Sequence, residues 1–156
     1  MPTTMKISPC FFLLLLFTPG LTFGEGTGKN FLRIEKSTQS DTDLSITSIG
    51  GFGFNDGKIG HADLLYIKSV NEGDGLAMDA GAAYAFNAGA AFFVGGGFLL
   101  GYNWDKNGII GAFYPEAGIA VNITKSLGIT LGAKRYFNLY DDTENIIMFG
   151  LLFSDL

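Results

Sequence analysis

Charged residues and cysteine are both scarce in this chain. Asp, Glu, Lys and Arg make up 16% of its 156 residues, whereas soluble domains average about 25%. Cys10 is the only cysteine and His61 the only histidine, so the chain can close no internal disulfide and has no Cys/His cluster with metal-ligand spacing. Its net charge of −5 leaves no basic surface for nucleic acid. We therefore expect no metal, no cofactor and no nucleic-acid partner.

Glycine and phenylalanine, in contrast, are abundant. The chain has 23 Gly and 15 Phe, and 47% of its residues are hydrophobic. A glycine content of this size is about twice the usual ~7%. Few charges together with many Gly and Phe favour a membrane protein built from strands over a soluble enzyme.

The N-terminal segment has the three parts of a secretory signal peptide. Lys6 provides the positive charge, residues 11–17 (FFLLLLF) form the apolar run, and Thr22-Phe23-Gly24 offers small residues at the positions that a signal peptidase reads. The apolar run is far shorter than the ~20 residues of a membrane-spanning helix. We predict a signal peptide at 1–24 and one domain at 25–156, exported without cysteine.

Residues 76–104 alternate strictly between two kinds of side chain. Leu76, Met78, Tyr84 and Phe86 fall on one parity, against Asp79 and small residues on the other. The pattern resumes from 92 to 104, after Asn87-Ala88-Gly89. A period of two indicates strands with one apolar and one small or polar face, and the break between them indicates a hairpin.

The same period recurs along the rest of the chain. Further strands are expected at about 31–36, 43–54, 59–69, 109–121, 127–138 and 146–153, which makes eight. Because lipid cannot hydrogen-bond a backbone, a sheet can cross a membrane only if it is closed. The prediction is an all-β fold, an eight-stranded antiparallel up-and-down transmembrane β-barrel. Leu44, Ile46, Phe52 and Phe54 share the apolar, lipid-facing parity of the second strand, and Pro115 predicts a bulge in the sixth.

Two other architectures fit part of the sequence less well. Residues 88–102 could form a membrane helix, but three adjacent glycines would each cost a helix about 1 kcal/mol relative to alanine. A soluble sandwich or lipocalin-like barrel would reverse the faces and place the charges outside. Scarce charge argues against it, as do the aromatic residues, which sort to two rims. Those expected at the periplasmic rim are Phe52, Phe54, Tyr84, Phe86 and Phe153, and those at the outer rim are Tyr66, Tyr102, Trp104, Phe137 and Tyr140.

Charged side chains share the face opposite to the apolar one. Since charges face hydrocarbon only at high cost, they should point into the lumen, and an eight-stranded barrel is narrow enough for side chains to fill. A packed ion-pair network is therefore favoured over an ion or proton path. Arg135 is the exception, because it lies on the lipid parity and needs a position near the outer rim. The expected network consists of Arg33, Glu35, His61, Asp63, Asp79, Glu116 and Lys134.

An export signal, eight alternating strands and short turns resemble the small outer-membrane barrels of the OmpA and OmpX type. Residues 113–153, with YPEAGIAV and SLGITLGAKRYFNL, look more specifically similar to YfaZ-like proteins. The resemblance implies a bacterial outer-membrane location, contact with its lipids, and handling by the export and barrel-assembly machinery, with Gly150-x-x-Phe153 as part of the assembly signal. We expect a monomeric non-enzyme with a structural or envelope-interaction role. The alternatives are a lipid A-modifying enzyme using His61 and a narrow channel.

Overall fold

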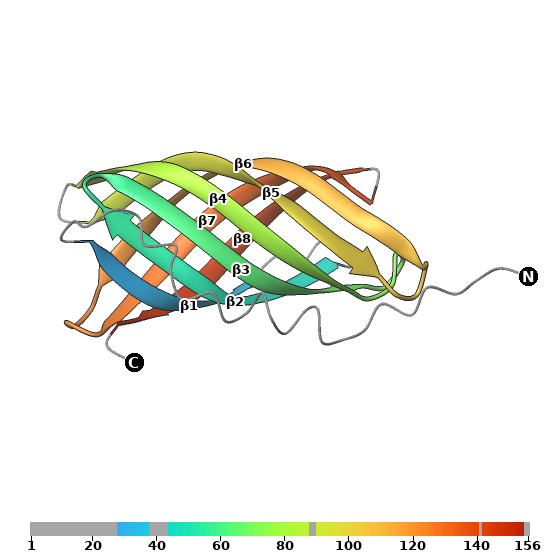
Figure 1. Ribbon diagram of the computed structural model, residues 1–156, viewed down its shortest axis with the longest axis horizontal. Helices are drawn as coiled ribbons and strands as arrows, with labels where there is room; N and C mark the ends of the chain where they lie inside the picture. Colours follow the sequence, from blue (N-terminus) through green and yellow to red (C-terminus); the bar gives the residue numbers. More distant parts are fainter. Residues whose placement is uncertain (1–27, 38–43, 88–89, 141, 155–156) are drawn as a thin grey trace, which may run out of the picture.

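The computed structural model describes residues 28–37, 44–87, 90–140 and 142–154 as one closed antiparallel barrel (Figure 1). The predicted signal peptide at 1–24 lies outside these residues. No helix in the described part of the chain is long and apolar enough to cross a membrane. The eight strands are β1 (Lys29–Ser37), β2 (Leu44–Asn55), β3 (Lys58–Ser69), β4 (Gly75–Asn87), β5 (Ala91–Asn103), β6 (Gly108–Asn122), β7 (Leu127–Leu139) and β8 (Asp142–Phe153).

Each strand pairs with its neighbours in sequence, and β1 closes the barrel by pairing with β8 from Leu32↔Phe153 to Ser37↔Met148. The prediction of an eight-stranded up-and-down barrel is confirmed. Strands β2, β4, β6 and β8 finish at one end of the barrel, which we call the turn end, and β1, β3, β5 and β7 finish at the other, the loop end. In Figure 1 the turn end is on the left. One boundary was wrong, since β8 begins at Asp142 rather than after a loop reaching residue 145.

In seven of the eight strands, the residues that face inward and those that face outward are the ones that the alternation predicted. In β4 and β5, for example, Val94 and Phe98 are 59% and 62% exposed on the outside, while Asp79 is 2% exposed on the inside. Apolar side chains thus cover the outer wall and charged ones point into the lumen. This arrangement is the reverse of a soluble barrel.

Strand β2 is the exception, and its predicted orientation was wrong. Ile46 and Phe52 are 0% and 3% exposed and point into the lumen, whereas Thr47 and Ile49 point outward. The reason lies at Gly50, which pairs with Arg33 on one side and Asp63 on the other. Placing this glycine inward leaves room for the Asp63 side chain and the backbone of β3, and the apolar residues of its parity must then point inward too.

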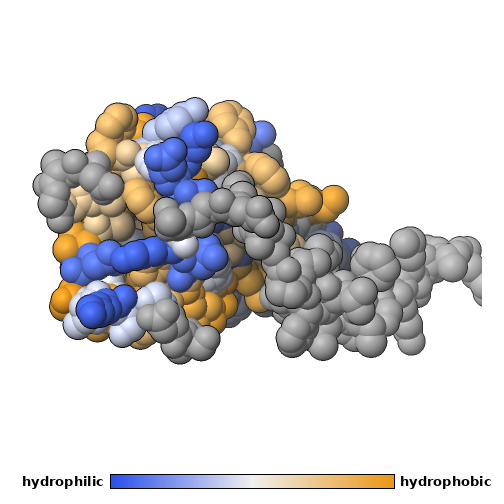
Figure 2. All heavy atoms as spheres, turned by 60° about the vertical axis from the view of Figure 1, so that its left-hand side comes forward, coloured by the Kyte–Doolittle hydropathy of each residue, from blue (hydrophilic) through white to orange (hydrophobic). Residues whose placement is uncertain are grey.

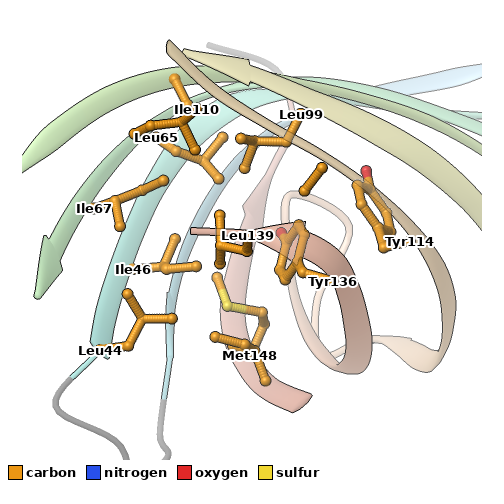
Figure 3. Close-up of a cluster of buried hydrophobic side chains, with 13 residues drawn as sticks. Leu44, Ile46, Leu65, Ile67, Leu99, Ile110, Tyr114, Tyr136, Leu139 and Met148 are labelled. Atoms are coloured by element: carbon orange, nitrogen blue, oxygen red, sulfur yellow. The ribbon is translucent and has the colours of Figure 1, made fainter. Parts of the chain in front are cut away.

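The lumen is packed in three layers along its axis. Near the loop end lies a cluster of thirteen buried residues that includes Ile46, Leu65, Leu99 and Met148 (Figure 3). Near the turn end lies a smaller cluster: Phe31, Phe52, Ile59, Ala83, Phe93 and Leu152. The buried charges lie between the two. The apolar clusters were not predicted, partly because β2 supplies residues to both.

The bulge predicted at Pro115 is not there. The β6–β7 register is the same before and after it, at Phe113↔Phe137 and Glu116↔Lys134. Pro115 points outward and is exposed, and the β6–β7 ladder lacks the pairs at Tyr114 and Pro115, next to the missing N–H of proline. The register shift lies instead between Phe137 and Leu139 in the β7–β8 pairing. There Asn138 has a φ of 67°, a conformation that asparagine tolerates better than most residues.

Most of the aromatic residues lie at the rim predicted for them. The exceptions lie in β2 and next to the bulge at the end of β7. Tyr84 and Phe86 are exposed on the outside at the turn end, as Tyr66, Tyr102 and Trp104 are at the loop end. Trp104 stacks on Tyr66 with ring centroids 6.2 Å apart. The predictions were wrong for three residues that pack on the lumen clusters, namely Phe52, Phe54 and Tyr140.

The orientation of β2 can be tested with two neighbouring cysteine substitutions. In a Cys10→Ser background, Thr47→Cys places a thiol on the exposed outer face, whereas Ser48→Cys places it in the lumen, where Ser48 is 4% exposed. An apolar maleimide should label the first variant quickly and the second only after unfolding. Equal rates in the folded protein would contradict the orientation described here.

Candidate functional site

All seven residues of the expected network point into the middle of the lumen and are buried. They come from five strands: Arg33 and Glu35 from β1, His61 and Asp63 from β3, Asp79 from β4, Glu116 from β6 and Lys134 from β7. We call this set, with the hydroxyl groups that bind it, the ionic layer. Charged groups this deep must be paired with one another, because leaving an ion unsolvated costs several kcal/mol.

Arg33 joins the first and third strands across Gly50. Its guanidinium donates two hydrogen bonds to Asp63, one from Nε to Oδ1 at 3.3 Å and a shorter one from Nη2 to Oδ2. Its Nη1 lies 3.5 Å from Glu35 Oε1, and Glu35 also accepts a hydrogen bond of 3.0 Å from Thr130 on β7. The planar fork of arginine suits such a paired grip on a carboxylate.

His61 lies between two carboxylates. Its Nδ1 is 2.9 Å from Asp63 Oδ2 and its Nε2 is 3.0 Å from Glu116 Oε1. An ionised carboxylate can only accept a hydrogen bond. With both carboxylates ionised, the ring must therefore hold a proton on each nitrogen and act as a third cation of the layer.

Asp79 accepts hydrogen bonds from three side chains in the other half of the layer. It accepts a hydrogen bond of 2.9 Å from Lys134 Nζ and one of 3.2 Å from the Tyr136 hydroxyl, and a closer one from Tyr114. Lys134 Nζ also lies 4.5 Å from the centre of the Tyr114 ring, within the range of a cation–π contact.

The two tyrosines and Thr130 were missing from the predicted network. Sequence analysis singled out only residues that carry a charge. The signal was nevertheless present, because Tyr114 lies two residues from Glu116, and Tyr136 two from Lys134. Residues two apart on a strand point to the same side, so a polar hydroxyl on the charged parity is a candidate partner.

These hydroxyl groups supply hydrogen bonds to carboxylates of the layer. The layer holds four carboxylates, two permanent cationic side chains (Arg33 and Lys134) and the His61 ring, so its acidic groups outnumber its basic ones by one. The Tyr114 and Tyr136 hydroxyls donate to Asp79, and the Thr130 hydroxyl donates to Glu35. Hydrogen bonds to a charged group are stronger than neutral ones.

Glycines on neighbouring strands make the space for this layer. A Cβ added to Gly50 would lie 2.5 Å from Asp63 Oδ1, one added to Gly81 2.5 Å from His61 Nε2, and one added to Gly150 2.5 Å from Thr130 Oγ1. These distances are shorter than any real contact of a Cβ. The high glycine content is thus explained in part by large polar side chains that lie across their neighbours.

The chemistry open to the layer is narrow. His61, Asp63 and Asp79 offer ligand atoms within 4.8 Å of one another, which is the spacing of a metal site. However, the same atoms already bind one another, Arg33, Lys134 and Tyr114. Both ring nitrogens of His61 face carboxylates, so neither is directed at a hydroxyl nucleophile. The arrangement is that of an internal salt-bridge network.

Comparison with known proteins agrees with the fold. The chain matches no protein-family model and no curated protein. It is similar to a de novo designed transmembrane β-barrel, with 16% identity, a TM-score of 0.54, and coverage of 81% of this chain and 95% of that one. It is also similar to the Neisserial surface protein A, with 10% identity, a TM-score of 0.58, and coverage of 82% and 96%. At such identities the likeness concerns the fold alone, and the resemblance to OmpA, OmpX and YfaZ-like proteins stays a prediction.

The role of the glycines can be tested with two adjacent residues. Gly50→Ala should destabilise the barrel by about 1–3 kcal/mol, the usual cost of overpacking, because the new methyl group meets Asp63. Gly51→Ala should change little, since Gly51 points outward and a Cβ there would have no neighbour within 4 Å. Urea unfolding midpoints measure both effects. An equal loss for the two variants would contradict the proposed packing.

The pairing of charges predicts that removing one partner of an ion pair destabilises the barrel more than removing both partners. Arg33→Met leaves Asp63 and Glu35 without their shared cation and should cost about 3–5 kcal/mol. Adding Asp63→Leu should recover part of that loss, and Lys36→Met, an exposed change on the same strand, should be close to neutral. The free energies of unfolding decide it. A double variant whose losses simply add would show that the two residues are not coupled.

Proposed function

We propose that the chain is a small bacterial outer-membrane barrel with a closed lumen and a structural or envelope-interaction role. The observation that carries this proposal is the orientation of the wall. Bulky apolar side chains such as Val94, Phe98 and Leu100 are exposed around the outside, while the charged groups are buried inside. Water would favour the reverse arrangement, whereas acyl chains favour this one.

The few charges on the outer wall support the same proposal. Within the described strands, the outward-facing charged residues are Lys36, Lys58, Lys68 and Arg135, with no carboxylate among them. Lys36, Lys58 and Lys68 lie at or next to a strand end. Arg135 lies in the loop-end half of β7, with its guanidinium 5.4 Å from the centre of the Phe137 ring. Long cationic side chains near a membrane surface can reach its headgroups.

A closed lumen supports a structural role better than transport or catalysis. The ionic layer is bounded by an apolar cluster on each side, so an ion that crossed the lumen would have to pass through both apolar clusters. A lipid A-modifying enzyme would need His61 at an accessible position, yet His61 is 5% exposed and engaged at both nitrogens. Both alternatives are therefore less well supported.

The remaining parts of the proposal rest on the sequence. Cleavage after a signal peptide at 1–24 would export the chain, and the barrel-assembly machinery would insert the domain at 25–156. With an apolar wall on all sides, its partners are outer-membrane lipids and it is complete as a monomer. The turn end would face the periplasm, because an even number of strands returns both chain ends to one side.

Membrane insertion predicts that a charge on the outer wall is tolerated only near the rim. Lysine costs about 2–4 kcal/mol at the middle of a bilayer and about 0–1 kcal/mol near its surface. Phe98→Lys, in the middle of β5, should therefore impair folding far more than Phe86→Lys, near the end of β4. The two phenylalanines are 62% and 64% exposed, so a soluble protein should accept both changes.

The measurement is outer-membrane fractionation followed by a gel with and without boiling. The wild-type protein and Phe86→Lys should be found in the outer membrane and migrate differently before boiling, whereas Phe98→Lys should lose the folded band. A soluble wild-type protein, or equal behaviour of the two variants, would overturn the membrane proposal.

A closed lumen also predicts that the barrel does not conduct. Purified protein added to a planar lipid bilayer should give no current steps above those of detergent alone, under conditions in which a porin does. Reproducible steps that change with Asp79→Asn or Glu116→Gln would instead establish the channel alternative.

A further inference from the structure

The two ends of the lumen are filled differently. At the loop end Tyr140 packs on the apolar cluster, and a cavity of about 190 Å³ remains beside Leu44, Leu139 and Tyr140, lined otherwise by polar and acidic residues such as Glu72 and Asp142. At the turn end an open cavity of about 490 Å³ remains, lined chiefly by Phe31, Phe52, Phe54, Ala120 and Leu152, with Lys29 at its edge. Figure 2, which brings this end forward, shows hydrophilic and apolar residues side by side on the surface. The volume is in the range of about 300–1,000 Å³ typical of sites for small organic ligands.

The cavity exists because its walls are unequal. Phenylalanines from β1 and β2 form one side, and Ala90, Ala91 and Ala120 form the other. Its floor is the turn-end cluster, in which Phe52 packs edge-to-face on Phe31 and Phe93 with ring centroids 6.4 Å and 6.3 Å apart. Because these aromatic rings pack against one another, they do not move into the space beside the alanines, and the cavity stays open.

Lys29 gives the cavity a polar end. It is the first residue of β1 and shares the inward parity of Phe31 and Arg33, so it lies on the lumen side of the mouth. Asn122 lies at the end of β6 and also lines the cavity. An apolar chamber with a cation at its mouth is complementary to a molecule with an alkyl chain and one anionic end. We propose that this cavity binds a fatty acid, with its chain against the phenylalanines and its carboxylate at Lys29.

Two tryptophan probes distinguish this site from the surrounding bilayer. In a Trp104→Phe background, which removes the native tryptophan, Phe54→Trp places a probe in the cavity and Phe86→Trp places one on the outer wall at the same end. The protein is folded into phosphatidylcholine vesicles, and its gel shift shows whether it has inserted. A failure to insert would contradict the membrane proposal and would say nothing about the cavity. A fatty acid brominated on its chain is then added as quencher.

The cavity probe should be quenched saturably and the outer probe only in proportion to the quencher dissolved in the bilayer. Ala120→Phe, which fills the cavity, should abolish the saturable part, while Ala117→Phe, on the outer face of the same strand, should leave it intact. Lys29→Gln should weaken binding of the acid several-fold but leave unchanged the weaker binding of a brominated alcohol of equal length. Each methylene removed from the chain should weaken saturable binding about fourfold.

Two results would overturn the proposal. One is quenching of the cavity probe that is linear and unaffected by Ala120→Phe, which would mean that the probe senses only the bilayer. The other is equal quenching of both probes by brominated phosphatidylcholine, which would assign the cavity to membrane lipid rather than to a fatty acid.

Discussion

Burying charge in a narrow tube is the constraint on which this structure depends. Four carboxylates lie in the lumen where water cannot solvate them, and each must find its partners among side chains from other strands. Arg33 links β1 to β3, His61 links β3 to β6, and Asp79 links β4 to β6 and β7. Backbone pairing joins only neighbours in the barrel, whereas these contacts cross it. The ionic layer therefore favours one register of the strands, because a shift by one residue would turn its members outward.

The rest of the lumen is arranged around that layer. Large polar side chains need empty neighbours, and glycines at 50, 81 and 150 provide them. The layer also needs a low-water environment in which the ion pairs are strong, and the two apolar clusters supply it from either side. Tyrosines serve both purposes, since the rings of Tyr114 and Tyr136 pack in the loop-end cluster while their hydroxyls reach Asp79.

Sequence reasoning succeeded where a single rule decides the answer and failed where two rules compete. Alternation is unambiguous in β4 and β5, because the charged or small parity and the bulky parity are separate. In β2 both parities contain apolar residues and glycine, and the deciding fact is that Gly50 lies between Arg33 and Asp63. That neighbourhood depends on the register of three strands, which no local pattern contains. The apolar clusters were missed for a related reason, since only the charged residues of the inward face were singled out.

The same three layers set limits on what the barrel can do. In a lumen closed by the ionic layer and the loop-end cluster, as proposed above, a molecule that enters at the turn end must leave there as well. Under that proposal the cavity at that end is a pocket and not the entrance of a path. Its aromatic floor also separates it from the charges, since Phe52 lies beneath the Arg33 guanidinium, with its ring centre 5.2 Å away. A ligand could thus bind in the pocket without disturbing the ion pairs that hold the fold, which makes binding and stability separable in this barrel.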